Sequence, residues 1–329
     1  MNKNLSNLIV PRINVNSDSS LSNAINLVNK FHFDSFILFA SEEIKFGEKV
    51  TFPIERFNFL KKELQKKSET KILFFIDAEN GFGHRCDVGK KFDVKDLVSN
   101  EKKEIIKKFF EINMELYENQ ISFNLAPVVD VNIFNQEILK GRSYSNDPEV
   151  ITRIASLFID SCYSNKIVPC LKHFPGQGAA IGDTHLKITQ SSLSLDELLS
   201  THISPFVNLI DKVELIMLNH VNYLSFDRES IPASMSKKII NDLLVKKLGY
   251  KKVVISDSLR MGALTENFLQ ENVIESFIRN GGDLILDPVD PKEAIKVVNR
   301  IFSQSSELII KKIKKINNLK AKARSFLKR

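Results

Sequence analysis

Residues 147–173, DPEVITRIASLFIDSCYSNKIVPCLKH, contain one complete unit of the pattern that decides the fold. Asp147-Pro148 is a typical helix start, because an aspartate caps the first turn and proline fits the first helical position. Apolar residues then recur at helical spacing through Pro148–Ser164, which predicts an amphipathic helix. The apolar run Ile167–Leu171 follows, and a lysine and a histidine come directly after it. The stretch therefore predicts a helix and then a buried strand with polar side chains at its carboxyl end.

Short apolar runs of the same kind recur along the whole chain. They are rich in Ile, Val, Leu and Phe and nearly continuous, which is typical of parallel strands covered on both faces. The eight runs are Leu8–Val10, Ser35–Phe39, Ile72–Ile76, Ile121–Ala126, Ile167–Leu171, Glu214–Leu218, Val253–Ser256 and Leu284–Leu286.

Amphipathic segments separate these runs and predict the helices of an α/β protein. They are Ser20–Lys30, Ile54–Lys66, Glu101–Glu118, Pro148–Ser164, Ser194–Leu209, Ser236–Lys247 and Met261–Arg279. Eight strand–helix units in succession predict a single TIM-type (β/α)₈ barrel, one domain over residues 1–329, with a further helix at the carboxyl end. An open dinucleotide-binding sheet would have a glycine-rich turn after its first strand, but Pro11-Arg12-Ile13 stands there.

Composition and charge narrow the class of protein. No run approaches the ~20 apolar residues of a membrane-spanning helix, and the first residues lack the apolar core of a signal peptide, so we expect a cytoplasmic protein with no membrane partner. Cys86, Cys162 and Cys170 show no Cys-x-x-Cys spacing and are expected to be reduced thiols.

The net charge of +7 is concentrated near the carboxyl end. Ile309, Ile313, Ile316 and Leu319 recur at helical spacing among those lysines. This pattern favours an amphipathic final helix with a solvated basic face over a nucleic-acid-binding tail. No cofactor and no nucleic acid are expected as partners, and the sequence gives no indication of an oligomeric state.

Polar residues gather at the predicted carboxyl ends of the strands, where barrel enzymes place their chemistry. Convergence of these side chains at one rim predicts a polar pocket able to bind a hydroxyl-rich ligand. They are Asp77, Asp130, Lys172, His173, Asn219, His220, Asp257 and Asp287.

The loop after the fifth strand contains three glycines and then Asp183-Thr184-His185. A carboxylate beside an imidazole orients the ring and raises its pKa, which suits proton donation near neutral pH. An ordinary surface loop is the alternative interpretation. Asp257, which leaves an apolar strand, could be a nucleophile, a metal ligand or a helix cap. No recognisable ligand spacing supports a metal, so none is expected.

Several motifs together resemble glycoside hydrolase family 3, and within it the NagZ-type N-acetyl-β-glucosaminidases (β-N-acetylhexosaminidases). Residues 172–178, KHFPGQG, with Asp183-Thr184-His185, resemble the family's Lys-His-Phe-Pro-Gly-His-Gly and Asp-Ser-His signature. Residues 255–261, ISDSLRM, resemble its nucleophile motif, and residues 77–81, DAENG, with Arg85, resemble its Asp-Gln-Glu-Gly-Gly and Arg stretch. Further matches are residues 126–132, 141–144 and 232–236.

This resemblance implies a retaining exo-acting hydrolase that uses a covalent glycosyl-aspartate intermediate. Asp257 would be the nucleophile and His185 the acid/base, with Asp183 as its partner. The implied substrate is an N-acetylglucosamine-containing disaccharide or muropeptide from peptidoglycan recycling. The residues implied to hold the sugar are Asp77, Arg85, Arg142, Lys172 and His173.

The chain departs from the family pattern at a few positions. Gln177 replaces the second histidine of the loop, Ser258 replaces the second aspartate of the nucleophile motif, Asn80 replaces a glycine, and Phe82 stands where an arginine is common. The changes at Gln177, Phe82 and Ser258 bear on substrate preference or rate, while the implied catalytic groups are all present.

Three alternatives follow from the same motifs. A β-glucosidase-like enzyme would commonly take its acid/base from a second domain, whereas here the Asp183-x-His185 loop supplies one. A phosphorolytic relative would use phosphate in place of water. A non-catalytic sugar-binding barrel would have little reason to keep Asp183, His185 and Asp257 together.

Overall fold

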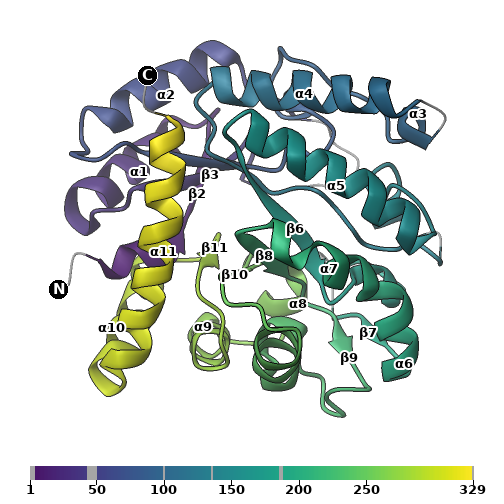
Figure 1. The fold of residues 1–329 in the computed structure, drawn as a ribbon. Coiled ribbons are helices and arrows are strands. Elements are labelled where there is room, and N and C mark those ends of the chain that lie inside the picture. Colours follow the sequence, from purple (N-terminus) through teal and green to yellow (C-terminus); the bar gives the residue numbers. More distant parts are fainter. Residues whose placement is uncertain (1–3, 43–49, 99–100, 135, 185–187, 328–329) are drawn as a thin grey trace.

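The computed structural model describes residues 4–42, 50–98, 101–134, 136–184 and 188–327. Within these ranges seven strands form one parallel sheet in the order β10-β8-β6-β5-β4-β3-β2 (Figure 1). Nearly every residue of these strands is buried, as the continuous apolar runs predict. The strands are β2 (Arg12–Asn14), β3 (Ser35–Phe39), β4 (Leu73–Ile76), β5 (Phe123–Asn124), β6 (Val168–Phe174), β8 (Leu215–Leu218) and β10 (Val253–Ser256).

Two short strands connect the two edges of this sheet. β1 (Ile9–Val10) pairs in parallel with β11 (Ile285–Leu286), and Leu284 forms a parallel bridge with Ile255 of β10. β1 continues into β2 through Pro11, whose carbonyl accepts a hydrogen bond from the Ile37 amide of β3. The pairing therefore returns to its starting point, and the predicted (β/α)₈ fold is confirmed.

Helices surround the strands (Figure 1). Asp147 caps α5 by accepting from the amides of Glu149 and Val150, as its place before a proline predicts. The main helices are α1 (Asp18–Phe31), α2 (Ile54–Gln65), α4 (Lys102–Glu118), α5 (Pro148–Ser164), α7 (Ser204–Leu209), the π-helix Lys238–Lys247, α9 (Gln270–Arg279) and α10 (Pro291–Gln304). Shorter ones are α3 (Lys95–Val98), α6 (Leu195–Glu197) and α8 (Gly262–Thr265).

The structure differs from the predicted boundaries in informative places. β6 continues through Phe174, since Lys172 bridges to Val128 and Phe174 pairs with Leu218. The segment predicted as one helix over Ser194–Leu209 is broken near Pro205, which has no N–H for a helical hydrogen bond. In a similar way, Met261–Arg279 forms two helices, α8 and α9.

The final helix, α11 (Ser306–Phe326), lies against the amino-terminal ends of the strands. Its lysines reach acidic residues one or two positions before strands. Lys320 Nζ lies 2.6 Å from Asp34, Lys315 Nζ lies 3.0 Å from Asp283, and Lys322 Nζ lies 2.9 Å from Glu214. Only some of the α11 lysines therefore belong to the solvated basic face that the sequence predicts, because Lys315, Lys320 and Lys322 pair with acidic residues of the barrel.

Two of the α11 lysines, Lys312 and Lys320, are buried. Burial lowers the pKa of Lys320 while Asp34 opposes the shift. The acidic partners lie far from α11 in sequence, so helical periodicity alone gave no sign of these pairs. No helix among the described residues is long and apolar enough to cross a membrane.

The buried Lys320–Asp34 pair predicts that two Asp→Asn substitutions differ strongly in their effect on the free energy of unfolding. Asp34→Asn leaves the ammonium of Lys320 buried without its counter-charge, so we expect a loss of about 3–5 kcal/mol in the free energy of unfolding. Asp18→Asn removes a carboxylate whose side chain is 85% exposed and which pairs with Arg56. That control should cost about 1 kcal/mol or less. Denaturant unfolding measures both, and equal losses would contradict the structural role of the pair.

Candidate active site

Asp257 follows β10 directly and is held by its neighbours. Its amide donates to the carbonyl of Leu218, and its Oδ1 accepts from the amide of Ser258 at 2.8 Å. These two contacts fix the backbone and one carboxylate oxygen at the carboxyl end of the strand, where a barrel enzyme places reactive groups.

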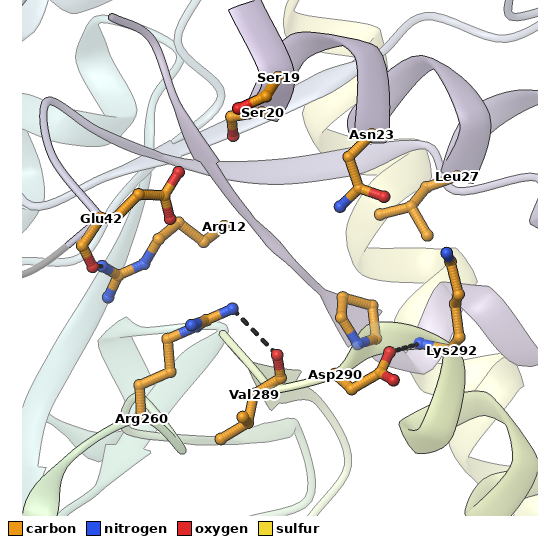
Figure 2. A pocket seen from close by; sticks show the side chains of 11 residues that line it. Arg12, Ser19, Ser20, Asn23, Leu27, Glu42, Arg260, Val289, Asp290 and Lys292 are labelled. Carbon is orange, nitrogen blue, oxygen red and sulfur yellow. Dashed lines mark hydrogen bonds between the residues drawn. The ribbon is translucent and has the colours of Figure 1, made fainter. Parts of the chain in front are cut away.

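Asp287, which follows β11, supports this strand end from behind. Its carboxylate is fully buried and accepts from the Ser258 hydroxyl at 2.7 Å. Arg12 approaches it at 2.6 Å and Arg260 at 3.2 Å, and Figure 2 shows Arg260 also donating to the carbonyl of Val289. Ser258 therefore serves as a donor to Asp287. An aspartate at position 258 would bring a second negative charge to the same place.

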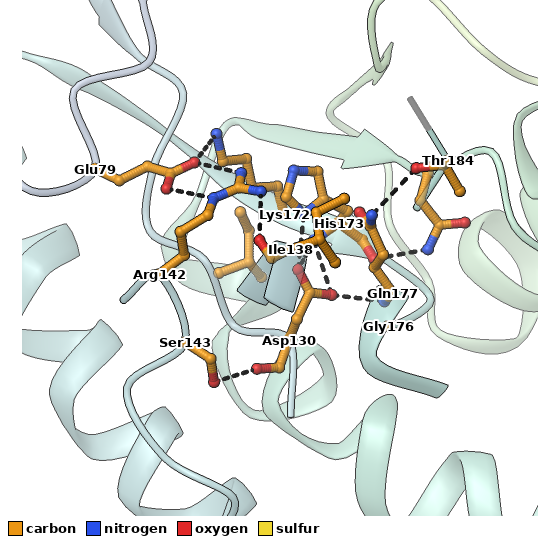
Figure 3. Close-up of polar contacts among 12 residues, drawn as sticks. Glu79, Asp130, Ile138, Arg142, Ser143, Lys172, His173, Gly176, Gln177 and Thr184 are labelled. Carbon is orange, nitrogen blue, oxygen red and sulfur yellow. Dashed lines mark hydrogen bonds and ion pairs between the residues drawn. The ribbon is translucent and has the colours of Figure 1, made fainter. Parts of the chain in front are cut away.

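A second cluster surrounds Lys172, whose side chain is 1% exposed. Its Nζ lies 2.6 Å from Asp77 Oδ1 and 2.6 Å from Glu79 Oε1. Arg142 forms a two-pronged pair with Glu79, at 2.8 Å from Nε and 2.7 Å from NH2 (Figure 3). Two carboxylates thus balance two cations at the ends of β4 and β6.

These pairs shift the ionisation of their members. Burial by itself would raise the pKa of Glu79, but the charges of Arg142 and Lys172 hold it well below its usual value. Burial would lower the pKa of Lys172, yet Asp77 and Glu79 raise it above normal. Glu79, Arg142 and Lys172 are therefore held in their charged forms at neutral pH.

The backbone of residues 77–85 is fixed by close packing. Arg85 Nε donates to the carbonyl of Asp77 at 2.6 Å, and Asn80 donates to the carbonyl of Gly141. Gly81 has φ 112° and lies so close to Lys90 that a Cβ would stand 2.3 Å from its carbonyl oxygen. Only glycine fits there. Asn80, a departure from the family pattern, thus links this turn to the Arg142 segment.

The carboxylate of Asp130 orients the imidazole ring of His173. Its carboxylate is fully buried and lies 2.6 Å from His173 Nδ1, and it also accepts from the amides of His173 and Gln177 (Figure 3). Because the carboxylate accepts, the ring hydrogen is assigned to Nδ1, which leaves Nε2 for another partner.

The loop that carries Asp183 is tied to both sides of the site. The side chain of Gln177 donates to the Thr184 hydroxyl at 3.2 Å, and the Ala263 amide donates to the Thr184 carbonyl at 3.1 Å. Asp183 itself is half-buried. Gln177 therefore connects the start of the loop to its end, while Ala263 belongs to α8, just beyond Asp257. His185, the predicted acid/base, lies outside the described residues.

His202 packs beneath this loop. Its ring is fully buried, and neither ring nitrogen has a hydrogen-bond partner among the described residues. Burial lowers the pKa of His202 to about 4, so the ring is neutral at pH 7. A Cβ on Gly176 would stand 2.7 Å from the His202 Cβ, so this histidine sets how closely the loop approaches the barrel.

Comparison with known proteins identifies the family. The sequence profile of the glycosyl hydrolase family 3 N-terminal domain matches residues 2–319. The chain belongs to glycoside hydrolase family 3. A protein named beta-hexosaminidase from Psychromonas ingrahamii is 30% identical over 261 residues, 76% of this chain and 76% of that protein. Another of that name from Hydrogenovibrio crunogenus is 26% identical, over 78% of this chain and 74% of the relative.

Solved structures agree on the fold. A family 3 beta-N-acetylglucosaminidase from Paenibacillus sp. str. FPU-7 superimposes with a TM-score of 0.87 at 22% identity, over 98% of this chain and 62% of that one. This family 3 chain thus spans about three-fifths of the length of that protein. At this identity the likeness concerns the fold alone.

The structure brings most of the predicted site residues of this family 3 enzyme to one end of the barrel. Asp77, Lys172 and His173 lie at strand ends, while the contacts described for Arg85 and Arg142 are to other site residues. Sequence reasoning assigned no role to Glu79, although a buried lysine requires carboxylates nearby. It also placed Asp130 only at a strand end. No group of three or more His, Cys, Asp or Glu among the described residues is arranged to hold a metal.

The Glu79 cluster predicts a variant with a lower free energy of unfolding. Glu79→Gln leaves the buried Lys172 and the half-buried Arg142 with one carboxylate between them, so the free energy of unfolding should fall by about 3–5 kcal/mol. Because the pKa of Glu79 is depressed, its contribution is present at neutral pH and is lost in acid. The difference in the free energy of unfolding between wild type and variant should stay constant from about pH 8 to pH 5. It should become smaller below about pH 4.

Unfolding titrations at several pH values measure that difference, with Glu137→Gln as the control. Glu137 pairs with Lys140 at the surface, where its side chain is 70% exposed. A difference for Glu79→Gln no larger than that of the control would refute the role of the cluster.

Proposed function

We propose that this family 3 enzyme is an exo-acting β-N-acetylglucosaminidase that hydrolyses terminal N-acetyl-β-glucosaminyl linkages with retention of configuration. The observation that carries the proposal is the contact between Thr184 and Ala263. It brings the Asp183 loop against the segment that follows Asp257. A retaining glycosidase needs its nucleophile and its acid/base roughly 5 Å apart across the anomeric carbon. The names of the beta-hexosaminidase relatives support the sugar.

Asp257 is the proposed nucleophile. The amide of Ser258 holds its Oδ1, which fixes the direction of the carboxylate before substrate binds. A preoriented carboxylate loses little freedom on reaching the transition state. An Asp257 oxygen attacks the anomeric carbon and forms the glycosyl ester as the bond to the leaving oxygen breaks.

His185 is the proposed acid/base, and Asp183 is its orienting partner. In the first step the imidazolium gives its proton to the leaving oxygen. In the second step the neutral imidazole takes a proton from water, whose oxygen attacks the anomeric carbon. This step restores the Asp257 carboxylate and the protonated histidine, so protons and bonds balance over the cycle.

The Lys172 cluster and His173 are proposed to hold the sugar. Asp77 and Lys172 offer an acceptor and a charged donor to hydroxyls, and His173 offers the Nε2 that Asp130 leaves available. Arg85 and Arg142 are proposed to contribute from the same side while they fix Asp77 and Glu79. Because the cluster is already paired, little reorganisation is needed when the sugar binds.

The proposed substrate is a disaccharide or muropeptide in which N-acetylglucosamine is linked to an N-acetylmuramic acid derivative. Cytoplasmic recycling of peptidoglycan fragments is the corresponding role, carried out by residues 1–329 as one catalytic domain. The proposed reaction uses side chains alone, without a cofactor.

The first test is release of 4-nitrophenol from its N-acetyl-β-glucosaminide and its β-glucoside. Wild type should cleave the N-acetyl sugar and leave the glucoside nearly intact. Asp257→Ala should lose more than the ~10²–10⁴-fold typical of removing an acid/base, because the covalent route is gone. Its thermal unfolding midpoint, measured beside wild type, controls for misfolding.

Other outcomes of that assay point to other reactions. Cleavage of the glucoside alone would replace the proposed sugar preference. Turnover that depends on added phosphate would replace hydrolysis by phosphorolysis. No cleavage of either substrate by a folded protein, with or without phosphate, would contradict the enzymatic proposal.

The role of His185 predicts a dependence on the leaving group. His185→Ala should lose roughly 10²–10⁴-fold in kcat/KM on a sugar leaving group, which needs a proton. It should lose far less in the first step with the 4-nitrophenyl glycoside, because 4-nitrophenolate departs without a proton. Kinetics on the aryl glycoside and on a disaccharide measure the two losses, and equal losses on both substrates would rule out the acid role.

A further inference from the structure

The outer surface of α4 carries an apolar stripe that the described residues leave open to solvent. Ile106, Phe110 and Met114 are spaced four residues apart, so they follow one side of the helix. Their exposed fractions are 42%, 45% and 43%. The core takes other residues of α4, among them Phe109 and Leu116. The stripe is therefore an addition to the apolar face on which the barrel depends.

The stripe lies on the wall of the barrel, away from the active site. α4 is an outer helix beside α5 (Figure 1). Asn113 donates to the hydroxyl of Ser161 in α5 at 3.2 Å, and Asn113 stands three residues after Phe110. The stripe thus follows the flank of α4 next to α5. Because the outer helices run along the wall while the chemistry sits at one end, a partner on this flank leaves the site at Asp257 open.

The charges of α4 are divided along its length. Residues 102–108 contain four lysines and one glutamate, whereas residues 109–118 contain three glutamates and no lysine or arginine. A helix dipole favours the opposite order, because its amino end is positive and its carboxyl end is negative. The order of these charges therefore brings α4 no stabilisation from its own dipole.

Some of these charged groups border the stripe and are available to a partner. Lys103 lies one turn before Lys107, and Glu118 lies one turn after Met114, all on the same flank of the helix. Lys103, Lys107 and Glu118 are exposed and form no ion pair with any residue in the described part of the chain. The stripe thus has free positive charge beside its first half and free negative charge at its far end.

We propose that α4 pairs in antiparallel orientation with the α4 of a second copy of this chain, so that the protein forms a homodimer. A two-fold axis near Phe110 places Ile106 opposite Met114 of the second copy and Phe110 opposite its own counterpart. The same axis places Lys103 beside Glu118 of the second copy. A surface that is basic at one end and acidic at the other is complementary to itself only in this orientation.

Antiparallel pairing also compensates the unfavourable order of charges within one helix. Each lysine-rich amino end lies beside a glutamate-rich carboxyl end, and each positive helix terminus lies beside a negative one. A helix of 17 residues is about 25 Å long. A contact of that length is near the small end of the range for protein interfaces, so a dissociation constant of roughly 1–100 µM is expected. The proposal is independent of the reaction at Asp257.

The test is sedimentation velocity of the full chain from about 1 to 200 µM, a range that spans the expected dissociation constant. Wild type should shift from monomer to dimer as its concentration rises. Phe110→Glu should stay monomeric, because it buries two carboxylates against each other at the axis. Phe59→Glu is the matched control and should associate like wild type, because Phe59 is a 49% exposed phenylalanine of α2, outside the stripe. Thermal unfolding midpoints confirm that each variant is folded.

An exchange of charges tests the orientation. Lys103→Glu alone, or Glu118→Lys alone, should raise the dissociation constant roughly tenfold, because like charges then face each other in both symmetric pairs. The protein that carries both changes should recover most of the wild-type affinity, because opposite charges face each other again. A wild type that stays monomeric throughout, a dimer that survives Phe110→Glu, or a double variant no tighter than the single ones would overturn the proposal.

Discussion

The burial of one positive charge, that of Lys172, organises the active-site end of the barrel. An ammonium that is 1% exposed loses its hydration, and this loss is offset only if carboxylates with good geometry surround it. Asp77 and Glu79 meet that need from β4, and Glu79 in turn binds Arg142. Each member is therefore held by another, and the segments after two strands are fixed relative to each other before any sugar arrives.

Buried charges that are balanced by several close partners also occur at neighbouring strand ends. Asp130 receives three donors from the loop that begins at His173, and Asp287 receives Arg12, Arg260 and Ser258. A buried carboxylate with several donors is more rigid than a surface ion pair, since breaking any one contact leaves charge without compensation. Three buried anionic centres thus shape the rim around Asp257.

Much of this arrangement could be predicted from the order of residues. Parallel strands leave nearly continuous apolar runs, and the polar residues that follow them must share one rim, so the barrel and the positions of Asp77, Lys172 and Asp257 were accessible. The pairings were not, because Lys172 and Asp77 are 95 residues apart and neither sequence segment names its partner. For the same reason the sequence alone assigned no role to Glu79 or Asp130. The first strand was predicted to end before Pro11, whereas the structure continues beyond it as β2.

The final helix bears on how the protein reaches its native state. Lys320 meets Asp34 across 286 residues, and β1 meets β11 across nearly the full chain. Such distant contacts slow folding, because the entropy of closing the loop is lost before the contact forms. During synthesis the edges of β2 and β10 stay open until the last strand and α11 leave the ribosome. Open edges are templates for pairing between chains. The synthesis of β11 and α11 therefore controls how long these strand edges are exposed to aggregation.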